Sequence, residues 1–201
     1  MSFTNLALDL LLPTKCCVCG KLPMLLCPGC EPSYLPRLHK DDSEVWFATE
    51  YTDEFAKIIN SYKENGRVAL AKHLVIALDQ LLNTAFANAE FSEIAYVQSS
   101  RSNLRKRGFK PMKLLLSHSK FASGCQLVEL KLTRKVSDQS NLNREQRIEN
   151  LAGAYRATRA LERVLLVDDV RTTGSTLGAM ATAVEDAGGT VAGRAVLAMN
   201  F

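Results

Sequence analysis

Apolar residues recur with two different periods along the chain, and the order of these periods predicts an α/β fold. Phe55, Ile58, Ile59 and Tyr62 fall on one face of a helix, and Thr52 is placed to cap that helix. Helices are predicted over 52–66, 67–86, 111–124, 144–150 and 176–187. Strands are predicted over 45–51, 91–100, 126–134, 164–168 and 190–199. From residue 94 onward strands alternate with helices, which predicts a parallel sheet with helices on both faces.

The same pattern divides the chain into three segments. Residues 1–36 hold a short amphipathic helix and a cluster of cysteines. Residues 37–93 are interpreted as a linker and a helical segment that lead into the core, because prolines and the lack of a clear period precede the first helix. Residues 94–201 form the α/β domain, which therefore carries the predicted sheet.

Composition narrows the class of protein. The chain is 47% hydrophobic and 23% charged, which allows a sizeable buried core and argues against a disordered chain. Its apolar runs all fall short of the roughly 18 residues that a membrane-spanning helix needs. The first 13 residues contain Asp9 and lack a basic start, so we interpret them as an amphipathic helix rather than a signal peptide. We therefore expect a cytoplasmic protein, and small α/β domains of this kind often form oligomers.

Basic residues are concentrated in one stretch of the chain. No acidic residue occurs between Glu93 and Glu129, although the net charge of the whole chain is only +4. The stretch contains seven basic residues, namely Arg101, Arg105, Lys106, Arg107, Lys110, Lys113 and Lys120. We predict that Arg105, Lys106 and Arg107, with Gly108, form a basic loop at the carboxyl end of the strand near residues 94–98.

Four of the six cysteines form two C-x2-C pairs, Cys16 with Cys19 and Cys27 with Cys30. Each pair directs two thiolates toward one point, and four sulfurs are the ligand set of a closed structural zinc site. A redox pair or two local disulfides are the alternatives, and metal is favoured in a reducing compartment. Cys17 is an alternative ligand to Cys16, but its C-x-C spacing makes a poorer chelate turn.

An unusual acidic pair follows the most apolar strand. Asp168 and Asp169 come directly after Val164–Val167, at the end of a strand where ligands of parallel sheets bind. A turn that leads into a helix follows, and it offers backbone N–H groups and hydroxyls to a phosphate. Its residues are Arg171, Thr172, Thr173, Gly174, Ser175 and Thr176. Carboxylates accept hydrogen bonds from a diol, so the pattern predicts a site for a ribose 5-phosphate group.

Two alternatives apply to this acidic pair. An acidic pair after a strand also begins receiver domains, where it holds Mg²⁺, but the 32 residues that follow Asp169 are too few for that fold. The other alternative is a retained fold with an inactive site.

The run D-D-x-x-x-T-G-x-T, from Asp168 to Thr176, resembles the ribose-phosphate signature of type I phosphoribosyltransferases. The resemblance implies that Asp168 and Asp169 bind the ribose hydroxyls of phosphoribosyl pyrophosphate (PRPP). It also implies that residues 172–176 surround the 5′-phosphate, and that residues 94–201 form a phosphoribosyltransferase-like parallel sheet flanked by helices.

The resemblance extends over nearly the whole chain. A four-cysteine finger, YKENGR, LRKRGFKP, DQSNLNREQRIENLAGAY and the acidic motif follow one another as in the ComF (competence protein F) family. It implies binding of PRPP or a ribose 5-phosphate group with Mg²⁺, and transfer of phosphoribose to or from a nucleobase. The alternative role is a non-catalytic accessory protein in uptake or use of single-stranded DNA, with a DNA-uptake helicase as partner. The sequence departs from the family at 95–102, which lacks its prolines, and at Lys110, where Asn is usual.

Cationic residues outside the motif are candidates for the pyrophosphate. Lys63, Arg105 and Arg107 would hold this leaving group, with Mg²⁺ bridging its oxygens. Solvated surface charge is the alternative for each of them. Arg144 and Arg147 share one helix face and would either form a lid or pair with neighbouring glutamates.

Overall fold

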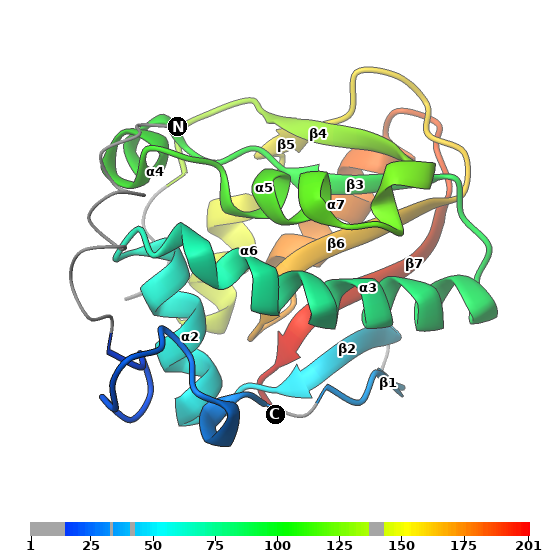
Figure 1. The fold of residues 1–201 in the computed structure, drawn as a ribbon. Coiled ribbons are helices and arrows are strands. Elements are labelled where there is room, and N and C mark those ends of the chain that lie inside the picture. Colours follow the sequence, from blue (N-terminus) through cyan, green and yellow to red (C-terminus); the bar gives the residue numbers. More distant parts are fainter. Residues whose placement is uncertain (1–14, 33, 41–42, 137–142) are drawn as a thin grey trace.

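The computed structural model describes residues 15–32, 34–40, 43–136 and 143–201, which form an α/β fold around one sheet (Figure 1). The helix predicted within residues 1–13 lies outside these ranges, as do residues 138–142 of the ComF-like motif. None of the helices in these ranges is long and apolar enough to cross a membrane.

The sheet of the described chain has seven strands in the order β1-β2-β7-β6-β3-β4-β5. The strands are β1 (Arg37–His39), β2 (Val45–Glu50), β3 (Glu93–Val97), β4 (Gln126–Leu132), β5 (Tyr155–Arg156), β6 (Val164–Arg171) and β7 (Val191–Met199). Strands β2, β7, β6, β3 and β4 run parallel, and the two short edge strands pair antiparallel. The predicted parallel sheet is confirmed for the five central strands.

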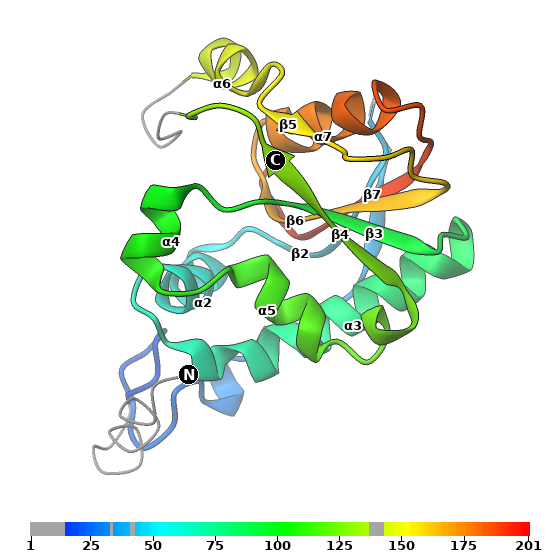
Figure 2. The same cartoon turned by 90° about the horizontal axis from the view of Figure 1, so that it is seen from above.

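Helices cover both faces of the sheet, as predicted (Figure 2). The α-helices are α2 (Asp53–Lys63), α3 (Ala71–Asn88), α4 (Arg101–Arg107), α5 (Pro111–His118), α6 (Arg144–Leu151) and α7 (Ser175–Glu185). Short 3-10 turns lie at Pro28–Cys30, Val68–Leu70 and Ala122–Gly124. Along β6, Leu165 and Val167 pack in the core that contains α2, α3 and α5, whereas Val164 and Leu166 pack against α7. This alternation explains the continuous apolar run of β6, because a central parallel strand is buried on both sides.

Local signals set the ends of the helices that carry the site. The hydroxyl of Thr52 accepts a hydrogen bond from the N–H of Phe55 at 3.3 Å, which confirms the predicted cap of α2. Helix α7 begins after Gly174, whose φ of 77° is accessible to glycine at little cost. These two signals fix the start of α2 and the start of α7, and α2 ends at Lys63.

Two predictions about the middle of the chain need correction. Residues 101–107 form helix α4 rather than a loop, because the Ser100 hydroxyl accepts from the N–H of Asn103 and Gly108 adopts a left-handed φ of 75°. Residues 37–93 are more than a lead into the core, since β1 and β2 extend the sheet and β2 pairs with β7.

Candidate functional site

The acidic pair lies at the carboxyl end of β6. Both aspartates are half-buried, and the N–H of Asp169 donates to Oδ1 of Asp168 at 2.9 Å. The ammonium of Lys63, at the last turn of α2, forms an ion pair with Oδ2 of Asp169 at 2.7 Å. The Lys63 and Asp169 side chains are only 22% and 15% exposed. A predicted pyrophosphate residue and a predicted ribose residue, 106 positions apart, therefore meet directly.

The environment of the pair changes its protonation. Burial, together with the neighbouring charge of Asp169, raises the pKa of Asp168 to about 7, although Lys63 opposes this rise. Burial alone would lower the pKa of Lys63, but the charge and hydrogen bond of Asp169 raise it above its ordinary value. Lys63 is thus the cation that compensates both carboxylates. The second negative charge of the pair therefore lowers the stability of the fold.

The turn after the pair has the geometry of a helix N-terminus lined with hydroxyls. Thr173 Oγ1 and Ser175 Oγ lie 2.9 Å apart, and the N–H of Ser175 donates to Thr173 Oγ1 at 3.4 Å. The first N–H groups of α7 lack helical acceptors, as in every helix, and the helix dipole makes this end positive. This end of the motif suits an anion such as phosphate.

Arg171 is directed away from the acidic pair. Its guanidinium donates to Met199 Sδ at 3.4 Å and to the hydroxyl of Ser43 at 3.2 Å. A Cβ at Gly174 would lie 3.1 Å from Arg171 Nε, so glycine lets the arginine pass beneath the turn. Arg171 and Thr173 line a smaller cavity of about 340 Å³ beside His39 and Phe201.

A larger cavity of about 580 Å³ opens over the carboxyl ends of β3 and β6. Six of the residues predicted for the site line it, namely Lys63, Arg107, Asp168, Asp169, Thr172 and Thr176. Gly174 and Ser175 belong to the turn but line neither cavity, and Arg105 is exposed outside both. The structure therefore gathers the two ends of the motif with Lys63 and Arg107, and leaves Arg105 apart.

Glu64 is a charged residue that the sequence analysis missed. Its carboxylate forms ion pairs with Arg107 and with Lys106, the latter at 3.0 Å. Burial alone would raise the pKa of Glu64, but hydrogen bonds from these two cations hold it below its ordinary value. The sequence signal that could have identified Glu64 is its position directly after Lys63, at the end of α2. Glu64 thus fixes the cationic wall formed by α4, in which the Arg107 side chain is only 14% exposed.

Arg147 joins the site from helix α6. Its guanidinium donates to Thr172 Oγ1 at 2.9 Å, and it lines the larger cavity together with Asp168 and Asp169. Helix α6 thereby contacts the first hydroxyl of the turn.

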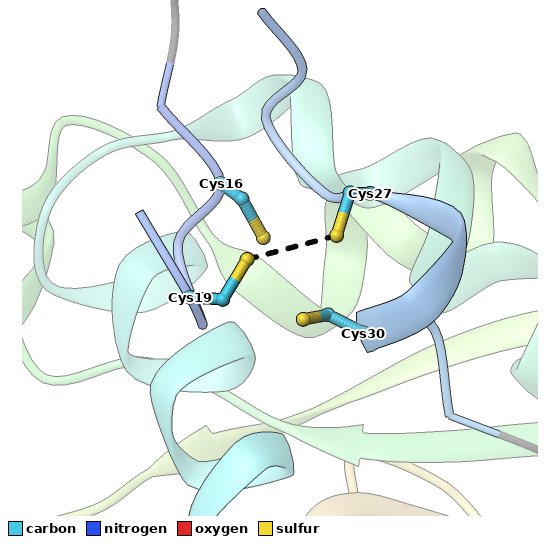
Figure 3. A group of neighbouring side chains, drawn as sticks. All are labelled: Cys16, Cys19, Cys27 and Cys30. Carbon is cyan, nitrogen blue, oxygen red and sulfur yellow. Dashed lines mark hydrogen bonds between the residues drawn. The ribbon is translucent and has the colours of Figure 1, made fainter. Parts of the chain in front are cut away.

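The four predicted cysteines meet at the N-terminal end of the described chain. The Sγ atoms of Cys16, Cys19, Cys27 and Cys30 all lie within 4.8 Å of one another, and those of Cys19 and Cys27 lie 3.7 Å apart. Figure 3 shows the four sulfurs directed toward one point. A tetrahedral site with metal–sulfur bonds of about 2.3 Å requires sulfurs roughly 3.8 Å apart. The cluster therefore has the size of a four-thiolate metal site, with Cys16 rather than Cys17 as the fourth ligand.

The cluster is attached to the corner between α2 and α3. Burial opposes ionisation of Cys16, yet hydrogen bonds from the backbone of Cys19 and Cys27 lower its pKa to about 6. Cys16 is buried in the same apolar core as α2 and α3. A hydrogen bond of 2.8 Å between the imidazole Nδ1 of His73 and the carboxylate of Glu31 provides a second link to α3. The finger therefore packs beside α2 and α3 (Figure 1).

Solved structures with a similar chain path are phosphoribosyltransferases. The adenine phosphoribosyltransferase from Rhodothermus marinus DSM 4252 is 21% identical over 68% of this chain and 70% of its own, with a TM-score of 0.37. The purine phosphoribosyltransferase from Pyrococcus horikoshii Ot3 is 19% identical over 64% and 73%, with a TM-score of 0.39. The adenine phosphoribosyltransferase from Leishmania tarentolae is 10% identical over 82% and 94%, with a TM-score of 0.45. Similarities with TM-scores this low assign no function to the chain.

Comparisons by sequence give no match. No protein-family model matches the chain, and no curated protein matches it. The function is therefore inferred from the chemistry of the larger cavity.

Proposed function

We propose that the chain binds the ribose 5-phosphate group of PRPP, with Mg²⁺, in the larger cavity. The observation that carries this proposal is the arrangement around that cavity of about 580 Å³. An acidic pair, a hydroxyl-rich helix N-terminus and the cations Lys63 and Arg107 all face it. A diol, a phosphate and a second anionic group, joined in one molecule, match these three features.

Each part of the site has a distinct task in this proposal. Asp168 and Asp169 accept hydrogen bonds from the ribose hydroxyls and fix the orientation of the sugar. The turn of residues 172–176 binds the 5′-phosphate, with Thr172 and Thr176 as its residues that line the cavity. Lys63 and Arg107 hold the pyrophosphate, and Glu64 keeps the Arg107 guanidinium in place. The acidic pair suits Mg²⁺ because hard cations prefer oxygen ligands, and the ion would neutralise charge on the pyrophosphate when bound.

The same arrangement supports a transfer reaction. The bond from the ribose C1 to pyrophosphate would break, a bond from C1 to a ring nitrogen of a nucleobase would form, and the proton of that nitrogen would pass to solvent. Charge that develops on the departing pyrophosphate would be stabilised by the ammonium of Lys63 and the guanidinium of Arg107. We propose this reaction, in either direction, as the activity of a ComF-like phosphoribosyltransferase.

Calorimetric titration with PRPP tests the proposal. We expect a dissociation constant on the order of micromolar in the presence of Mg²⁺, and at least about tenfold weaker binding without it. Single-stranded DNA is titrated in parallel at two salt concentrations. Absence of heat with PRPP, together with salt-sensitive binding of DNA, would reject the proposal and favour the accessory role in DNA handling.

We also propose that the four-cysteine cluster holds a structural zinc ion. Four thiolates at tetrahedral spacing leave no open position for water, so the ion would stabilise the fold rather than take part in the reaction. Leu26, within the finger, is buried in the same apolar core as α2. Loss of the ion is thus expected to loosen the packing next to Lys63.

Replacement of a ligand gives a direct prediction. We expect Cys27→Ser to reduce the zinc content from about one ion per chain to none, because a three-thiolate site binds zinc weakly. The free energy of unfolding should fall by about 2 kcal/mol, which lowers the melting temperature by roughly 4–8 °C. Zinc content is measured by atomic emission and stability by thermal denaturation. Cys17→Ser, one position from Cys16, is the matched control, and loss of zinc in it would contradict the assignment of ligands.

A further inference from the structure

A phosphate in the turn would be bound more strongly with a cation beside it, and the turn itself does not direct one into the larger cavity. The arginine of the motif, Arg171, is engaged by Ser43 and Met199 and lines the smaller cavity. Thr172 and Thr176 line the larger cavity but contribute hydroxyls only. A phosphate that carries up to two negative charges is held most strongly by hydrogen bonds from a charged donor.

Arg147 brings positive charge to this position from another element. Its Nη1 lies 2.9 Å from Thr172 Oγ1, at the start of the turn. The side chain is half-buried and lines the larger cavity with the acidic pair. A guanidinium has five N–H donors in a rigid plane, a geometry that matches the oxygens of a phosphate.

The position of Arg147 is set by the way helix α6 is held. Asn143 and Gln146 form a reciprocal capping box at its start, with hydrogen bonds of 2.9 and 3.0 Å. The Arg134 guanidinium donates to three carbonyl oxygens at its end, those of Glu149, Asn150 and Ala152. Helix α6 also packs against α7, the helix that begins at the turn. Arg147 and the turn therefore belong to one packed unit, which orients the guanidinium before ligand binds.

We propose that Arg147, and not the motif residue Arg171, supplies the positive charge that binds the 5′-phosphate. This inference rests on the proposed function, because it places the phosphate of the ribose 5-phosphate group in the turn. It makes Arg147 the residue that distinguishes a phosphorylated ribose from an unphosphorylated one. Arg171 instead supports the turn from the opposite side.

The test compares two ligands that would occupy different parts of the site. Ribose 5-phosphate and inorganic pyrophosphate, each with Mg²⁺, are titrated into the wild-type chain, Arg147→Gln and Arg147→Lys. We expect Arg147→Gln to weaken ribose 5-phosphate by at least about tenfold and to change pyrophosphate binding by less than about twofold. Arg147→Lys should recover part of the loss, because it retains the charge but not the planar donor geometry.

The control is Arg156→Gln, an exposed arginine on β5 that lines neither cavity. Thermal denaturation checks that each variant is folded. Ribose 5-phosphate binding within about twofold of wild type in Arg147→Gln would overturn the inference alone, as would equal weakening of both ligands. Failure of the wild-type chain to bind either ligand would instead overturn the proposed function, and the inference with it.

Discussion

Replacing both acids, in the variant Asp168→Asn/Asp169→Asn, is expected to weaken PRPP binding by at least about 100-fold. Two charged acceptors are lost, and a hydrogen bond to a charged group contributes about 1.5–3 kcal/mol. Among the described residues that line the cavity, Asp168 and Asp169 are the only acids, so no other carboxylate there can replace them. Calorimetry with PRPP and Mg²⁺ measures the loss.

The matched control is Asp186→Asn, an exposed acid at the far end of α7. It changes the net charge by one but lies outside the cavity, and we expect its affinity to equal that of the wild type. Binding that survives in the double variant would mean that the acidic pair belongs to the fold and not to a ligand site. Equal loss in the control would point to a general effect of charge.

The single variant Asp168→Asn is expected to raise the stability of the folded chain. The pKa of Asp168 is about 7 in the folded chain and ordinarily 3.8, so the folded state binds more protons between these values. Stability is therefore lost as the pH rises through this window, and the asparagine variant avoids the loss. We expect it to be more stable than the wild type by on the order of 1 kcal/mol at pH 8 and by little at pH 4. The site would thus bind ligand at the expense of stability.

Lys63→Met is expected to destabilise the fold by about 2 kcal/mol at pH 8, because it leaves two half-buried carboxylates without their cation. The raised pKa of Asp168 should increase further, so protonation of this carboxylate restores much of the stability by pH 5. Urea denaturation at both pH values measures this difference. Pyrophosphate binding should fall by at least about tenfold, since the ammonium would contact it directly.

Lys57→Met provides the control, since Lys57 is exposed on the same helix α2. The combined variant Lys63→Met/Asp169→Asn should recover part of the lost stability, because it removes the charge that was left unpaired. A loss that is the same at pH 5 and pH 8 would show that packing of the lysine stem matters, and not its charge.

The sequence carried enough information to predict the sheet and the motif, but not the directions of individual side chains. The position of the acidic pair is predicted correctly, because the apolar run 164–167 marks a buried central strand and the acids follow it directly. The direction of Arg171 depends on Met199 in the neighbouring strand and on Ser43 far away in the chain. Contacts of this kind are set by tertiary packing, and no local pattern reports them.

Helix α4 shows the opposite situation, in which a local signal was present but outweighed. Ser100 is a good N-cap, and Gly108 is the residue most often found after a helix end. The sequence analysis nevertheless predicted a basic loop there. The acid that compensates this charge, Glu64, lies on another helix, so the sequence near residues 101–107 does not reveal it.

The place of β7 in the sheet has a consequence for the order in which the chain can fold during its synthesis. Strand β7 lies between β2 and β6, and β2 contacts the rest of the sheet through it (Figure 1). Until residues 191–199 have left the ribosome, β1 and β2 can pair only with each other within the sheet, and Val45, Phe47 and Ala48 lack the strand they lie beside. Strand β2 thus lacks its neighbour β7 until late in synthesis. The nascent chain meanwhile exposes an open, apolar sheet edge of the kind that chaperones protect.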